Sequence, residues 1–87
     1  MVLIMSKKIT YRIIVDTVYG TLEIEMPISC KISELKRRVG LEFGIPDGDL
    51  EYFDLIYRGK ILNEELPIAL ELSDNAYVKL VPKTVVG

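Results

Sequence analysis

The sequence contains no histidine and no tryptophan, and Cys30 is its only cysteine. Without histidine, no Ser-His or Cys-His pair can activate a nucleophile. A lone cysteine cannot form an internal disulfide and offers too few ligands for a structural zinc site. The six glycines are scattered rather than gathered in a phosphate-binding loop. We therefore predict no catalytic residue, no metal site and no cofactor, and we expect a protein that is not an enzyme.

Long hydrophobic runs and an excess of positive charge are also missing. The apolar start, residues 1–5, is far shorter than the ~20 residues that cross a bilayer, and either Met1 or Met5 could be the true start. The net charge of −2 creates no basic field for nucleic acid. We expect neither a membrane nor a nucleic acid as partner. The single cysteine suits the reducing cytoplasm, which we predict as the location.

The 87 residues are 49% apolar and 28% charged, as in one globular domain, here predicted to be a monomer. Apolar and polar residues alternate along most of five short segments, which predicts five strands. Turn residues lie between them, including Gly59 and Asn75, which tolerate positive φ angles. The predicted strands cover residues 9–16, 22–26, 53–57, 60–62 and 77–81.

One amphipathic helix is expected after the first two strands. Ile32, Leu35 and Val39 recur at helical spacing with charged residues between them. Ser29 is the expected N-cap, and Gly44 can adopt the left-handed conformation that ends a helix. The order β-β-α-β-β-β predicts an α+β fold, a mixed sheet of four to five strands with the helix on one face. The predicted core consists of Ile13, Val15, Leu22, Ile24, Leu35, Val39, Leu55, Leu62, Val78 and Leu80.

Three short motifs point to a known family. "GIP" at residues 44–46 follows the helix, "LIYRGKIL" covers residues 55–62, and "AYVKLV" covers residues 76–81. In this order and spacing they resemble ubiquitin and its relatives, which share the β-grasp fold. The resemblance extends from about Tyr11 to Gly87. It is interrupted by about three additional residues near Tyr52.

The resemblance divides the chain into a leader (residues 1–10), a ubiquitin-like domain (residues 11–82) and a flexible tail (residues 83–87). Ubiquitin-like modifiers are activated at a terminal glycine and joined to target lysines, which implies Gly87 as the conjugation site. The implied partners are proteins: activating and conjugating enzymes, targets, a deconjugating protease and ubiquitin-like receptors. Modifiers of this kind end in Gly-Gly, whereas Val86, which is β-branched and stiff, precedes Gly87 here.

Three interpretations of Val86 are open. The enzymes could accept valine, the encoded chain could continue to a further glycine, or the protein could never be conjugated. The leading hypothesis is a ubiquitin-like modifier. The alternative is a ubiquitin-like interaction module that is not conjugated, which Val86 favours. A sulfur carrier, which forms a thiocarboxylate at the same glycine, fits the lysine-containing turn and the surface patch less well.

A surface patch is a second implication. Strand alternation places Ile56 and Val81 on the outward face of the sheet. The resemblance implies that Val18, Ile56, Lys79 and Val81 form a partner-binding patch. Each aliphatic side chain gains at most ~1.5–3 kcal/mol on burial, against an association cost of ~4–15 kcal/mol. We therefore expect weak, reversible binding.

The lysines also have counterparts in ubiquitin. Lys60 matches a lysine that ubiquitin uses for chain formation, which makes it a possible acceptor. Lys36 matches a largely buried helix lysine, and Glu64 stands where its acidic partner lies. We therefore predict that Lys36 and Glu64 are close together and that Lys36 is a poor acceptor.

Overall fold

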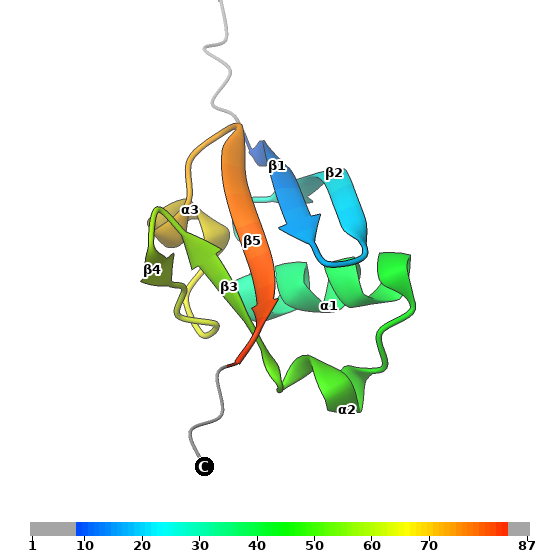
Figure 1. The fold of residues 1–87 in the computed structure, drawn as a ribbon. Coiled ribbons are helices and arrows are strands. Elements are labelled where there is room, and N and C mark those ends of the chain that lie inside the picture. Colours follow the sequence, from blue (N-terminus) through cyan, green and yellow to red (C-terminus); the bar gives the residue numbers. More distant parts are fainter. Residues whose placement is uncertain (1–8, 84–87) are drawn as a thin grey trace, which may run out of the picture.

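A five-stranded mixed sheet with one long helix across one face forms the domain, as the sequence predicts (Figure 1). The computed structural model describes residues 9–83. The strand order is β2-β1-β5-β3-β4, with β1 and β5 parallel in the centre and every other neighbouring pair antiparallel. The elements are β1 Thr10–Thr17, β2 Gly20–Pro27, α1 Ile32–Phe43, α2 Asp47–Leu50, β3 Phe53–Tyr57, β4 Lys60–Ile61, α3 Ile68–Glu71 and β5 Ala76–Pro82.

The first hairpin joins β1 to β2 in a register that puts apolar residues on one face. Ile13 pairs with Ile24 and Val15 with Leu22, so that these side chains point toward the helix. The turn is closed by the Thr17 hydroxyl, which accepts from the Tyr19 N–H and donates to the Gly20 carbonyl, both at 2.9 Å. β1 covers Thr10–Thr17 and so lies one residue later at each end than the predicted strand of residues 9–16.

The start of α1 differs from the expectation. The N-cap is Lys31 and not Ser29. Lysine offers no acceptor to the first-turn N–H groups, but the main chain of residues 64–66 does. The Ile32 N–H donates to the Leu66 carbonyl at 2.9 Å, and the Ser33 N–H donates to the Glu64 carbonyl at 3.1 Å. A loop distant in sequence therefore caps this helix, which local sequence signals could not reveal.

The other end of α1 packs closely against α2, a four-residue helix that the sequence did not predict. Gly44 ends α1 in the left-handed conformation, with φ of 72°, as expected. A Cβ atom on Gly40 would lie 3.0 Å from both terminal methyl carbons of Leu50 and 3.2 Å from the Ile45 carbonyl oxygen. Glycine within this helix therefore allows Leu50 of α2 to approach its backbone.

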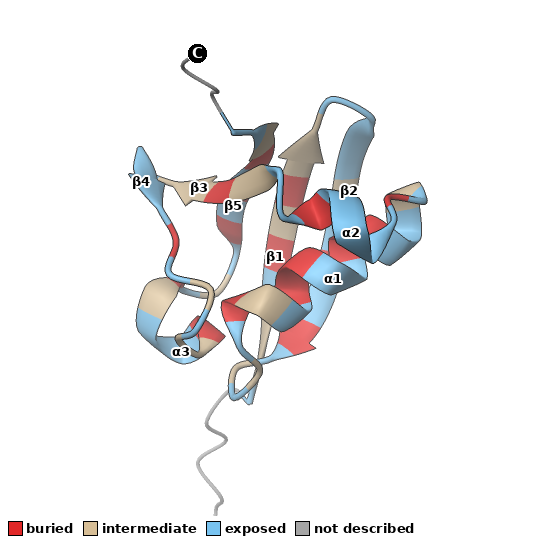
Figure 2. Ribbon diagram, turned by 90° about the horizontal axis from the view of Figure 1, so that it is seen from below, coloured by how far each residue is buried: buried red, intermediate tan, exposed pale blue. Residues whose placement is uncertain are grey.

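The core lies between the sheet and α1 (Figure 2). Nine of the ten predicted core residues are buried, and Leu22, the exception, is half-buried and packs against the core. The prediction missed several residues that come from the first residue of α1, the two short helices, the connecting segments and the strand ends. These are Met26, Ile32, Ile45, Leu50, Ile68, Leu72 and Ala76.

Candidate functional site

Three of the four residues predicted to form the patch, Ile56, Lys79 and Val81, lie on the outward face of β3 and β5. Leu55 pairs with Leu80, and both side chains are buried beneath the sheet. The alternating side chains therefore point outward. Ile56 lies directly opposite Lys79, and Val81 lies opposite Asp54. Ile56 and Val81 are thus diagonal neighbours on one face, at a spacing that aliphatic side chains can bridge, and both are half-buried.

The remaining patch residues lie toward β1. Lys79 is exposed and pairs across the parallel ladder with Asp16. Val18 is exposed and lies in the β1–β2 turn, two residues beyond Asp16, just as Val81 lies two residues beyond Lys79. Val18 and Val81 therefore lie at the same end of the sheet.

Ile61 is a neighbour of the patch that the sequence reasoning missed. It pairs directly with Ile56 across the β3–β4 ladder, and 59% of its surface is exposed. Two isoleucines side by side on a solvent-facing sheet provide more apolar contact area than either alone. The signal was present in the sequence, since an inward Leu62 puts Ile61 outward by strand alternation.

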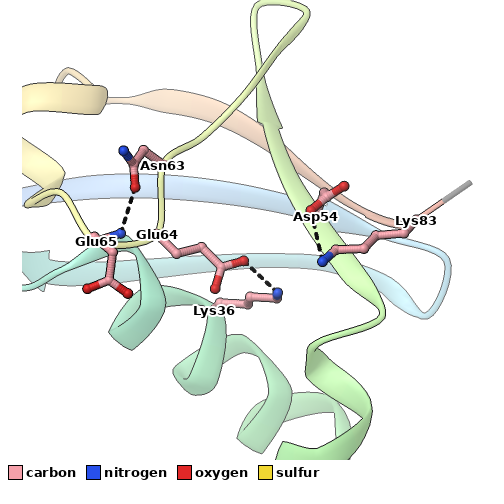
Figure 3. Close-up of polar contacts among 6 residues, drawn as sticks. All are labelled: Lys36, Asp54, Asn63, Glu64, Glu65 and Lys83. Atoms are coloured by element: carbon pink, nitrogen blue, oxygen red, sulfur yellow. Dashed lines mark hydrogen bonds and ion pairs between the residues drawn. The ribbon is translucent and has the colours of Figure 1, made fainter.

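The described chain ends beside β3. The Lys83 N–H donates to the Tyr52 carbonyl at 2.8 Å. The Lys83 ammonium lies 3.9 Å from Asp54, as Figure 3 shows. Residue 83, the first residue of the predicted tail, is therefore hydrogen-bonded to the domain, because the backbone pairing extends one residue beyond each strand, from Pro82 to Lys83 and from Phe53 back to Tyr52. The predicted conjugation site, Gly87, and the adjacent Val86 lie outside the described residues.

The lysines occupy contrasting environments. Lys36 is buried, and its ammonium lies 2.7 Å from the Glu64 carboxylate, which confirms the predicted proximity (Figure 3). Lys60 follows the turn formed by Arg58 and Gly59, both with positive φ. Its side chain is 72% exposed, with the ammonium 3.4 Å from Glu71. An exposed amine with one loose contact can reach an electrophile, whereas the Lys36 amine is enclosed.

Cys30, the single cysteine, is half-buried. Burial, together with the neighbouring Glu34, raises the pKa of the Cys30 thiol, which disfavours the thiolate that a nucleophile requires. Within residues 9–83, no group of three or more histidine, cysteine or carboxylate side chains could hold a metal ion. No helix of this region is long and apolar enough to span a membrane.

Comparison with known proteins rests on structure alone, because no family model and no curated protein matches the sequence. A structure described as "Molecular Mimicry of SUMO promotes DNA repair" matches with a TM-score of 0.78 at 19% identity, covering 87% of this chain and 95% of that one. Ubiquitin from Caldiarchaeum subterraneum matches with a TM-score of 0.72 at 21% identity, and the match covers 90% of this chain and 99% of that one.

A third match is to a longer chain in a complex of phosphorylated parkin, phosphorylated ubiquitin and UbcH7. The TM-score is 0.73 at 21% identity, and the match covers 86% of this chain and 23% of that one. These likenesses establish the fold, a mixed sheet wrapped around one helix that is shared with proteins of the ubiquitin-like group.

Proposed function

Given this ubiquitin-like β-grasp fold, we propose that the chain is a protein modifier, activated at Gly87, joined to target lysines and recognised through Val18, Ile56, Lys79 and Val81. The observation that carries the proposal is the arrangement around β5. This strand runs through the centre of the sheet and leads directly into the terminal segment. It also contributes Val81 and Lys79 to a partly apolar outward face.

In this function the partner enzymes perform the chemistry. The Gly87 carboxylate attacks the α-phosphate of ATP and releases pyrophosphate, giving an acyl adenylate. An enzyme thiolate then displaces AMP to form a thioester. A lysine amine of the target displaces that thiol, loses a proton and leaves an amide bond. The modifier contributes an accessible carboxylate, and its glycine has no Cβ to obstruct a narrow enzyme channel.

The test is thioester formation with an activating enzyme from the same source. Incubation with ATP should give an adduct that added thiol reverses, and deletion of Gly87 should abolish it. The deletion should leave the free energy of unfolding unchanged, because a glycine has no side chain to bury. Failure of the wild-type chain to form a thioester would reject the modifier function.

Val86 favours a second candidate, an interaction module that is never conjugated. A β-branched residue before the last glycine obstructs a channel shaped for two glycines. This module would use the same patch without any tail chemistry. Binding to a receptor domain that persists after deletion of residues 84–87, together with no thioester, would support it.

A further inference from the structure

Aromatic residues are concentrated around one pocket, away from the outward patch. Both phenylalanines of the sequence and two of its five tyrosines line it: Tyr19, Phe43, Tyr52 and Phe53. They come from the β1–β2 turn, the end of α1 and the segment between α2 and β3, which lie on the same side of the molecule (Figure 1). The pocket has a volume of about 300 Å³.

The rings differ in how far they are exposed. Phe43 and Phe53 are half-buried and pack against the core. Tyr19 and Tyr52 are 58% and 62% exposed, and the Tyr19 ring lies 6.3 Å from the Phe43 ring. The phenylalanines therefore form fixed walls, while the tyrosines present accessible ring surface at the rim. Together the four rings form one aromatic surface, and contiguous apolar surface is more typical of an interaction site than a single exposed ring is.

The pocket lies in an acidic part of the chain. Between residues 41 and 57 the sequence has five carboxylates and no lysine or arginine: Glu42, Asp47, Asp49, Glu51 and Asp54. Asp49 lines the pocket itself. Among residues 9–83, the only one of these five in an ion pair is Asp54, with Lys83. Asp47 and Glu51 line a different pocket together with Lys36 and Arg37. Asp49 and the negative faces of the rings are therefore the groups that favour a cation in the aromatic pocket.

We propose that this pocket binds an arginine side chain of a partner protein. A planar guanidinium can stack on the Tyr19 or Tyr52 ring and also donate hydrogen bonds to the Asp49 carboxylate. Lysine suits the site less well, because its compact ammonium is more strongly hydrated and cannot stack. The proposal does not require conjugation, since it depends on the pocket alone.

The pocket also lies next to Lys83, the last residue that the structure describes. Tyr52, at its rim, accepts the hydrogen bond from Lys83. A protein that binds the chain next to Lys83 therefore lies close enough to place an arginine in the pocket. An arginine there would therefore add contacts to a partner held by the chain end.

NMR titration with a short probe tests the proposal. The peptide acetyl-Gly-Arg-Arg-Gly-amide should shift the ring signals of Tyr19, Phe43, Tyr52 and Phe53 with a millimolar Kd. The same peptide with citrulline, which is neutral and nearly isosteric, should bind about tenfold more weakly. A peptide with lysine in both positions should fall between the two.

Variants separate the pocket from general charge attraction. Asp49→Asn and Tyr52→Ala should each weaken binding of the arginine peptide by about threefold or more. Glu25→Gln and Tyr77→Ala remove an exposed acid and an exposed ring on the sheet, and they should leave the Kd unchanged. Because these side chains are exposed, the backbone spectra should confirm that all four variants fold.

Three results would overturn the proposal. The first is equal affinity for arginine and citrulline, and the second is equal affinity for arginine and lysine. The third is an absence of ring shifts up to about 10 mM peptide. None of these depends on thioester formation, so the pocket and the modifier function can fail separately.

Discussion

The Lys36 ammonium lies 2.7 Å from a Glu64 carboxylate oxygen, and only 5% of the Lys36 side chain is exposed, against 36% for Glu64. The pair joins the middle of α1 to the loop that caps the same helix. The loop therefore contacts the helix twice, through backbone carbonyls at the first turn and through this carboxylate one turn later.

Removing one partner of this pair should be costly. Glu64→Gln leaves the Lys36 charge buried without a counter-ion, and we expect a loss of about 1–3 kcal/mol, below the full cost of a buried pair because Glu64 is partly exposed. Urea unfolding would measure it. Glu65→Gln is the matched control, because its contact with Lys31 is exposed at 3.7 Å, and it should cost under ~0.5 kcal/mol. Equal losses in both variants would contradict the buried-pair interpretation.

Replacing Gly40 with alanine should destabilise the protein, although alanine is the better helix former. Alanine favours a helix by about 1 kcal/mol over glycine, yet its Cβ would crowd Leu50 and the Ile45 carbonyl. Overpacking typically costs ~1–3 kcal/mol, so Gly40→Ala should lower the free energy of unfolding by about 1 kcal/mol.

Gly48→Ala is the control for this experiment, since a Cβ there meets nothing within 4 Å. It should be neutral or stabilise by up to ~1 kcal/mol. A stabilising Gly40→Ala would mean that α2 packs less closely on α1 than the structure indicates.

Substitutions in the patch should weaken partner binding while costing little stability. Ile56→Ala, Ile61→Ala and Val81→Ala remove outward side chains, and each should cost under ~1.5 kcal/mol while weakening binding to a ubiquitin-receptor domain in NMR titration. Leu55→Ala removes a buried neighbour and should cost ~2–5 kcal/mol. If Ile56→Ala destabilised as strongly as Leu55→Ala, the assignment of the two faces would be reversed.

The two partners of the Lys60–Glu71 contact should contribute very unequally to stability. The Glu71 side chain is only 5% exposed and accepts from the Asn63 N–H at 2.6 Å, whereas Lys60 projects into solvent. Glu71→Ala should cost about 1–2 kcal/mol by removing that acceptor, and Glu71→Gln should recover part of the loss. Lys60→Ala should lower the free energy of unfolding by under ~1 kcal/mol, because the buried Glu71 carboxylate keeps its hydrogen bond from the Asn63 N–H. A larger loss for Lys60→Ala than for Glu71→Ala would show that the surface contact dominates.

Local patterns in the sequence were sufficient for most of the sheet. Alternation placed Ile13, Val15, Val78 and Leu80 correctly, because one buried face imposes a period of two. The left-handed Asn75, with φ of 67°, was also predictable from its residue type.

Features that depend on tertiary contacts were not predictable. Lys31 begins α1 because the main chain of residues 64–66 accepts the orphan N–H groups. Gly40 is explained by Leu50, which a distinct short helix brings to it. The aromatic pocket combines Tyr19 with Tyr52, which only the fold places together.

The parallel pairing of β1 with β5 has a consequence for biosynthesis. The Arg12 N–H donates to Asp74, 62 positions further along the chain, and Ile13 pairs with Ala76. The centre of the sheet can therefore close only after nearly the whole domain has emerged from the ribosome. Until then β1 presents an open edge, and a nascent chain stalled before residue 76 cannot complete the sheet. Ribosomes halted before β5 should thus carry protease-sensitive chains, and resistance to protease should appear only once β5 has emerged.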